Sequence, residues 1–259
     1  PHRFYRAFNN LRYSPVSREV AGIAVFYNLL GAYTVLTAFP QLSRWLPVDL
    51  LSSLTTLAGY GAALSGIAAL YFMHRIYRIP ARPCGNHWQV LTSFYGSMLA
   101  LGPLAVGLVF APLAGDGSVL LGALAWVVVA GFVLEAIGLY AHARDMKQQG
   151  GEGAAAQYLQ TTQFAYSYAA RNAVLGLALS GVLAFALFTP QGAVGMVAWL
   201  AIAALAAAAA VLGRMLFYAL VIPTTMPGAF FWRNPAFQEH ARETGLAKMP
   251  QVGVAYEVH

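Results

Sequence analysis

Four arginines and one carboxylate gather where the chain first enters an apolar segment. Glu19 stands directly before the apolar run Val20–Phe39. The arginines are Arg3, Arg6, Arg12 and Arg18. An acid is thereby placed among cations at hydrocarbon depth or just above it, where an ionisable residue is costly and is by default a candidate for function. A carboxylate in such a position can act as a proton relay.

The composition identifies the class of protein that must position these residues. Hydrophobic residues make up 59% and charged residues 9% of the chain, and the mean hydropathy is +0.60. A soluble domain has about 25% charged residues, so we predict an integral membrane protein. Six apolar segments reach the roughly 20 residues that a helix needs to cross a bilayer. They are Val20–Phe39, Leu50–Met73, Trp88–Ala111, Ser118–Gly138, Asn172–Phe188 and Ala193–Ile222.

These segments predict an all-α fold, because they lack the alternation of polar and apolar residues that membrane strands show. We expect residues 1–222 to form a polytopic bundle of six transmembrane helices. Residues 223–259 form a tail with five aromatic side chains and no hydrophobic core of its own. That composition indicates a docking tail for a partner protein. The five are Phe230, Phe231, Trp232, Phe237 and Tyr256.

The cations fall almost entirely on one side of the predicted bundle. We call the side before Val20 face X; with six crossings it also holds the loops 74–87 and 142–171 and the tail. Thirteen of the Lys and Arg residues lie on face X and only Arg44 lies opposite. By the positive-inside rule face X is cytoplasmic. A basic face that docks an acidic partner would produce the same pattern, so this alternative stays open.

Metal chemistry, if any, must use histidine. Cys84 is the only cysteine, which excludes a disulfide framework, an iron–sulfur cluster and a thiolate zinc site within this chain. His74 and His142 lie at the X-side ends of two predicted helices and are candidate ligands of a b-type haem. The alternative is that both simply meet the membrane interface. No other metal site is predicted.

Two charged residues lie inside predicted spans, Glu135 and Arg214. Both fall nearer face X than the opposite face, so they could form an ion pair in lipid, where an unpaired charge is expensive. Such a pair could lock the register of two helices or could serve a function. Both interpretations agree with one cavity open to face X.

Three strings give the chain a resemblance to a known family. They are Arg6-Ala-Phe-Asn9 with Ser17-Arg-Glu19, Phe94-Tyr-Gly-Ser97 with Gly102-Pro103, and Gly213-Arg-Met-Leu-Phe-Tyr218. These strings resemble the membrane anchor subunit of dimethyl sulfoxide (DMSO) reductase-type molybdoenzymes (DmsC type). Members of that family have eight helices and a His-Leu-Gly segment just before the first string. We therefore expect two N-terminal helices and that histidine to be missing from this sequence.

The resemblance implies a bacterial inner-membrane complex of three subunits. In it a molybdopterin catalytic subunit and an iron–sulfur subunit dock on this anchor, which exchanges electrons with ubiquinone or menaquinone. Glu19 matches the family's quinone-site acid, and Arg6, Asn9 and Arg18 are the expected orienting groups.

Two longer strings, residues 1–19 and Tyr77-Arg-Ile-Pro-Ala-Arg-Pro83, are most similar to the anchor of cytoplasmic sulfite-oxidising complexes (SoeC type). A cytoplasmic face X fits that type, so we expect electrons from sulfite oxidation to enter the quinone pool. A DMSO reductase-type complex that oxidises menaquinol is the first alternative, and a b-haem membrane cytochrome is the second. A transporter is disfavoured, since the internal repeats and paired broken helices of that class are not found.

Overall fold

The computed structural model describes residues 4–78, 84–110, 112, 118–149, 151–220, 239 and 242–245. In this part of the chain all regular elements are helices and no strand occurs. Six of the helices are long and apolar enough to span a membrane, which confirms the predicted all-α polytopic fold. Apart from 239 and 242–245, the expected docking tail lies outside the described residues.

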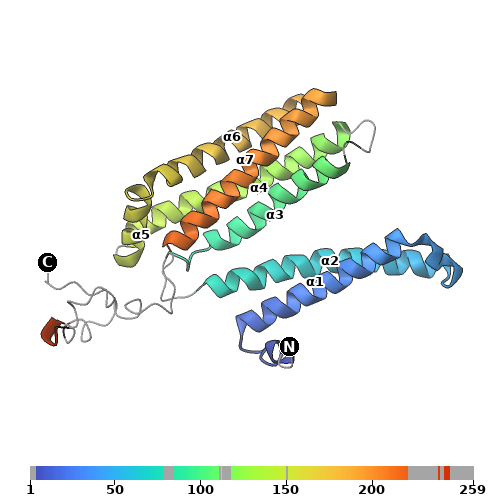
Figure 1. Ribbon diagram of the computed structural model, residues 1–259, viewed down its shortest axis with the longest axis horizontal. Coiled ribbons are helices and arrows are strands. Elements are labelled where there is room, and N and C mark those ends of the chain that lie inside the picture. Colours follow the sequence, from blue (N-terminus) through green and yellow to red (C-terminus); the bar gives the residue numbers. More distant parts are fainter. Residues whose placement is uncertain are drawn as a thin grey trace.

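The first two transmembrane helices form an antiparallel hairpin, α1 (Pro15–Ala38) and α2 (Val48–Tyr77) (Figure 1). A 3-10 helix, η1 (Phe4–Phe8), precedes the hairpin and another, η2 (Pro40–Arg44), joins its two helices. Small residues let the helices approach closely. A Cβ placed on Gly22 would lie 3.2 Å from the Cα of Ala69.

Helix α1 begins earlier than the expected Val20, because Ser14 and Pro15 form a helix start. The Ser14 hydroxyl accepts a hydrogen bond from the Ser17 backbone N–H at 3.3 Å, and proline is favoured at the first helical position. Arg18 and Glu19 therefore lie inside the helix rather than ahead of it.

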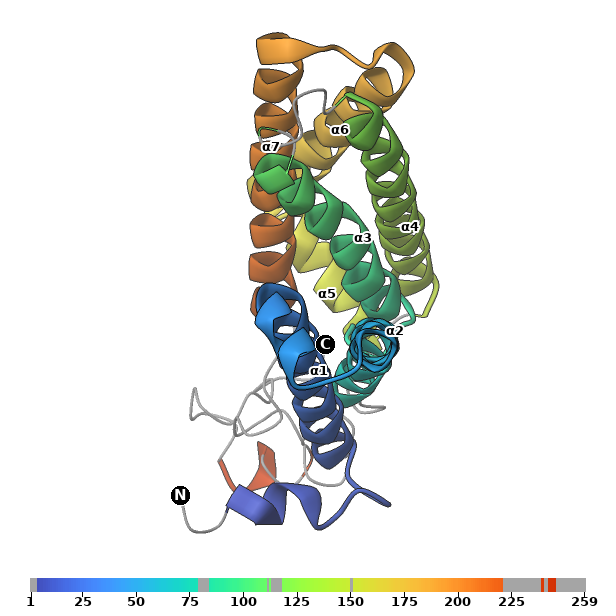
Figure 2. The ribbon, with the colours of Figure 1, turned by 90° about the vertical axis from the view of Figure 1, so that its right-hand side faces the viewer.

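The other four long helices form a bundle: α3 (Gln89–Phe110), α4 (Ser118–Gln149), α6 (Ala165–Phe188) and α7 (Gly192–Leu220). Figures 1 and 2 both show these helices together, with the hairpin beside them. The two parts meet near face X, where α2 ends and α3 begins. There the Tyr95 hydroxyl donates a hydrogen bond to the Ile67 carbonyl on α2 at 2.8 Å.

The bundle half that is remote from face X has a dense apolar core. Trp199 is 0% exposed, its ring centroid lies 5.1 Å from that of Phe185, and its indole N–H donates to the Leu104 carbonyl at 3.0 Å. Gly107 faces this indole so closely that an added Cβ would lie 2.5 Å from the indole nitrogen. This half therefore holds no room for a ligand around Trp199.

Two helix boundaries differ from the sequence prediction by seven residues or more. Helix α4 continues past the expected Gly138 to Gln149, and α6 begins at Ala165 rather than Asn172. Hydropathy marks the part of a helix inside hydrocarbon, whereas the helix itself can continue into the headgroup region. His142 and Arg171 consequently lie on helices. Between these two helices lies the shorter helix α5 (Gly151–Thr161).

Candidate functional site

A pocket opens near face X among α3, α4, α6 and α7, with the end of α2 beside it. Its empty volume is about 540 Å³, including space at its open mouth, and most of it is narrow. The aromatic part of the lining comes from Tyr77, Phe94, Phe217 and Tyr218. The polar part comes from Gln89, Ser93, Ser97, Glu135, Arg171 and Arg214.

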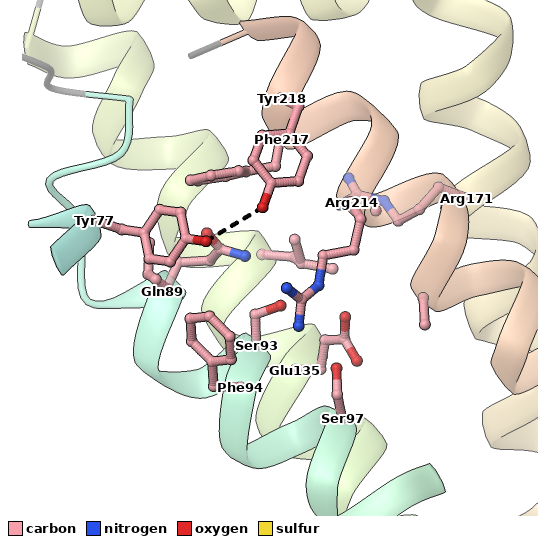
Figure 3. A pocket seen from close by; sticks show the side chains of 14 residues that line it. Tyr77, Gln89, Ser93, Phe94, Ser97, Glu135, Arg171, Arg214, Phe217 and Tyr218 are labelled. Atoms are coloured by element: carbon pink, nitrogen blue, oxygen red, sulfur yellow. Dashed lines mark hydrogen bonds between the residues drawn. The ribbon is translucent and has the colours of Figure 1, made fainter. Parts of the chain in front are cut away.

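The two intramembrane charges predicted from the sequence both border this pocket. Figure 3 shows Glu135 and Arg214 pointing into it. The guanidinium carbon of Arg214 lies 4.8 Å from the ring centroid of Phe94, a cation–π distance. Within the described residues no ion pair joins Glu135 to Arg214, although the two charges are within electrostatic range. The residues share one cavity without direct pairing.

Arg171 is a third charge in the same pocket, although the hydropathy pattern predicts a loop at this position. It is only 6% exposed, and its guanidinium carbon lies 5.2 Å from the ring centroid of Tyr168. Among the described residues its Nε has no hydrogen-bond partner. Because the hydropathy pattern set the helix start at Asn172, the residue before it was not recognised as intramembrane. A helix start placed one or two turns earlier would have found it.

A pair of tyrosines joins the hairpin to the bundle at the pocket mouth. The hydroxyl oxygens of Tyr77 on α2 and Tyr218 on α7 are 3.2 Å apart, a hydrogen bond drawn in Figure 3. The Tyr77 ring also contacts Phe217, with centroids 5.5 Å apart, and Phe94, at 5.8 Å. No motif in the sequence indicated this pairing, since the two tyrosines are far apart along the chain.

Glu19 lies on the hairpin side of this tyrosine pair. Its side chain is partly exposed, and within the described residues its carboxylate has no hydrogen bond or ion pair. It is within electrostatic range of the Tyr77 hydroxyl. The acid singled out from the sequence is therefore near the pocket mouth rather than inside the pocket.

The expected orienting groups do not converge on Glu19. Arg6 and Asn9 are exposed, and the Asn9 backbone N–H donates to the Arg6 carbonyl at 3.2 Å. The Arg18 guanidinium donates to two backbone carbonyls, that of Leu11 at 2.7 Å and that of Arg12. Arg18 thus fastens the segment before α1 to the start of that helix.

The two candidate haem ligands occupy different surroundings. His74 is buried on α2, and its Nδ1 lies 2.5 Å from the Tyr71 carbonyl. On α4, the Nε2 of His142 lies 2.9 Å from the Cys84 carbonyl, and its ring centroid is 5.2 Å from that of His87. The structure does not bring His74 and His142 together. The described residues also hold no cluster of three or more His, Cys, Asp or Glu side chains that could bind a metal ion.

His87 links the start of α3 to the end of α4. Its Nδ1 accepts a hydrogen bond from the Gln89 backbone N–H at 3.0 Å, so its Nε2 carries the proton and donates to Asp145 Oδ2, also at 3.0 Å. This arrangement caps α3 and holds the X-side end of the bundle in place.

A family model described as "DMSO reductase anchor subunit (DmsC)" matches residues 1–220 of the chain. The matched range includes all six transmembrane helices and the whole lining of the pocket. The chain belongs to the DmsC family. No curated protein and no solved structure matches it.

The family resemblance drawn from the sequence is confirmed. The chain is a multi-pass membrane anchor of a DMSO reductase-type molybdoenzyme complex, and membership implies a catalytic and an iron–sulfur partner subunit. The greater similarity to sulfite-oxidising complexes stays a prediction. So do the site residues, which rest on the geometry described above.

Proposed function

We propose that this anchor subunit exchanges electrons between its iron–sulfur partner and a membrane quinone near face X. The observation that carries the proposal is the pocket mouth, where Glu19 and the Tyr77–Tyr218 hydrogen bond lie beside an aromatic, partly polar cavity. A quinone head group approaching from the bilayer would reach this place between the hairpin and the bundle. The iron–sulfur subunit would dock on the same face.

The residues at the mouth suit quinone chemistry. Reduction of a quinone takes up two electrons and two protons, one proton on each carbonyl oxygen, and oxidation of the quinol releases them. The Tyr77 and Tyr218 hydroxyls can donate hydrogen bonds to a carbonyl oxygen, and their rings can pack against a flat head group. Glu19 has no competing partner among the described residues, so it is available to relay protons between quinone and face X.

The other candidate quinone-site residues, Arg6, Asn9 and Arg18, take no part in the proton exchange proposed for Glu19. Arg18 positions the start of α1 through its two bonds to backbone carbonyls. Arg6 and Asn9, exposed just ahead of α1, are available to a quinone head group or to the docked iron–sulfur subunit. Among the described residues of face X, Arg75, Arg78, Arg144 and Lys147 add positive charge for an acidic partner surface.

Glu19→Gln tests the quinone proposal in the intact complex. The substitution keeps the size of the side chain and removes its proton exchange, so quinone-linked turnover falls on the order of a hundredfold. Turnover of the catalytic subunit with a soluble artificial electron carrier stays unchanged. The matched control is Asp49→Asn, in the first turn of α2 at the end of the hairpin remote from face X. This variant keeps both activities. Equal loss of both activities in Glu19→Gln, or of neither, would contradict the assignment.

For the substrate, we propose oxidation of sulfite to sulfate, in which sulfite and water yield sulfate, two protons and two electrons for quinone. The proposal rests on the resemblance of residues 1–19 and 77–83 to the SoeC type and on the basic face X. We expect sulfite to drive quinone reduction by membranes that hold the intact complex. Membranes lacking the anchor should show none. Quinol oxidation driven by a sulfoxide, without sulfite activity, would transfer the assignment to the DMSO reductase type.

A further inference from the structure

A second cavity lies on the outside of the bundle, in a groove lined by residues of α4 and α6. Its walls are apolar along most of its length, where Leu139, Leu175, Gly176 and Leu179 line it. Its polar residues gather at one end. They are Arg171, Asn172, Tyr168 and Tyr140. The groove is thus amphipathic along its length and faces the bilayer.

Arg171 gives the polar end a positive charge that the described residues compensate only in part. It borders both this groove and the inner pocket and is only 6% exposed. Its buried Nε has no hydrogen-bond partner among the described residues. Among the described residues, Glu135 is the carboxylate within electrostatic range of both Arg171 and Arg214, so two cations face one anion. A buried donor without a partner is costly, and more so when it is charged. The Arg171 guanidinium is therefore short of hydrogen-bond acceptors within the described residues.

The depth of Arg171 in the bilayer matches that of lipid phosphates. At the opposite end of the bundle, a Cβ on Gly122 would lie 3.3 Å from Cγ2 of Thr189, so α4 and α6 are level there. Tyr140 and Arg171 each lie 18 residues from that level, which is about 27 Å along a helix. The hydrocarbon core is about 30 Å thick. With the Gly122–Thr189 level at the opposite edge of the core, Arg171 would lie close to its X-side edge, within reach of the headgroups.

We propose that the α4–α6 groove binds an anionic phospholipid. Its phosphate accepts hydrogen bonds from the Arg171 guanidinium and the exposed Asn172 amide, and one acyl chain lies along Leu175, Gly176 and Leu179. Basic pockets between transmembrane helices on one side of a membrane are suited to such headgroups. A quinone is the poorer occupant, because its carbonyls are neutral and leave the excess positive charge in place. This site is separate from the proposed quinone exchange and does not depend on it.

Gly176 allows the groove to be filled without disturbing the helix packing. It is exposed on α6, and a Cβ added there meets nothing within 4 Å. Gly176→Leu therefore places a side chain where the acyl chain would lie. Gly31 on α1 is the matched control, since its added Cβ also meets nothing within 4 Å and it does not line the groove.

Native mass spectrometry of the intact complex tests the proposal, because the mass of a retained lipid identifies it. The detergent-washed complex is titrated with phosphatidylglycerol or with phosphatidylcholine. We expect the unmodified complex and Gly31→Leu to retain a phosphatidylglycerol that phosphatidylcholine does not replace. Gly176→Leu and Arg171→Gln lose it.

Three results would overturn the proposal. The first is equal retention of phosphatidylglycerol in Gly176→Leu and Gly31→Leu, and the second is equal retention of the two phospholipids. The third is retention of a quinone in place of phospholipid that is lost in Gly176→Leu. Should Arg171→Gln fail to assemble, Gly176→Leu decides alone, because it leaves every charge in place.

Discussion

The hydroxyl pair of Tyr77 and Tyr218 is the point where single side chains join the hairpin to the bundle. Each tyrosine belongs to a different helix, and their rings also pack with Phe217, so removing one hydroxyl leaves the apolar contacts intact. What is lost is one hydrogen bond, worth about 1 kcal/mol, and one donor for a quinone carbonyl. Substituting either tyrosine therefore tests how the quinone head group is positioned rather than how protons are exchanged.

Tyr218→Phe should weaken quinone-linked turnover several-fold, mainly by raising KM for the quinone, because the head group loses a hydrogen-bond donor. The loss is smaller than that of Glu19→Gln, since a phenol orients the ring whereas the carboxylate carries protons. Steady-state assays with a short-chain quinone measure both constants. Tyr166→Phe, fully outside the pocket at 94% exposure, is the control. Unchanged constants in Tyr218→Phe would contradict a role at the mouth.

At the level of residues, the sequence predicted which charged side chains lie near the pocket, but it did not predict which residues they contact. Glu19, Glu135 and Arg214 stood out because a charge in an apolar run is conspicuous, and the structure places all three near one pocket. Arg171 was missed because it lies in the first turns of a helix whose hydropathy rises only after it. The tyrosine pair could not be predicted, since ordinary interface tyrosines occur throughout the chain and only tertiary packing selects two.

At the level of elements, α3 and α4 owe their close packing to facing glycines. A Cβ on Gly131 would lie 2.7 Å from the Ala100 backbone nitrogen, and one on Gly96 would lie 2.9 Å from the Gly131 carbonyl oxygen. Neither contact can be relieved by rotating a side chain, because the obstructing atoms are backbone. The close approach fixes the width of the pocket, since Ser97 and Glu135 line it from these two helices.

Gly131→Ala should destabilise the subunit by roughly 1–3 kcal/mol, the usual cost of overpacking, and should lower the Tm of the purified complex. Thermal unfolding followed by circular dichroism at a helical wavelength measures the change. Gly102→Ala on α3 is the control, because its Cβ meets nothing within 4 Å, and its Tm should not fall. Equal Tm values for the two variants would show that α3 and α4 have more freedom than the structure indicates.

The existence of six transmembrane helices followed from hydropathy alone, and their ends did not. Helix α1 starts where Ser14 and Pro15 cap it, and α4 continues through a polar segment to Gln149. Such ends depend on capping and on packing with neighbouring helices. They lie outside the hydrocarbon, where hydropathy does not indicate where a helix begins or ends. The pairing of α1 with α2, and of α3 with α4, agrees with the short connections between them.

At the level of the whole molecule, the positive charge of face X implies a fixed orientation in the membrane. Arg171 belongs to α6 rather than to a loop, but the excess of cations on face X remains. Arg44 is still the one loop cation on the opposite face. If these charges act during insertion, face X is cytoplasmic. The orientation also decides between the two substrate proposals.

Single-cysteine labelling should show that orientation in the full chain. Cys84 is the only cysteine and is buried, so Cys84→Ser provides a background without thiols. We expect a membrane-impermeant thiol reagent to label Gln191→Cys in intact cells. Gln163→Cys, between α5 and α6, should be labelled only after permeabilisation; both side chains are exposed. Labelling after denaturation is the control for expression. The reverse pattern would favour an exported partner and a sulfoxide substrate.

The dense packing around Trp199 has an energetic consequence for the cell. Electrons from a partner on face X, and protons relayed by Glu19 near the same face, meet the quinone without passing the sealed half of the bundle. Under the proposed function, turnover therefore moves no net charge across the bilayer. The complex would fill or drain the quinone pool, while the membrane voltage would be built by other respiratory enzymes that use that pool.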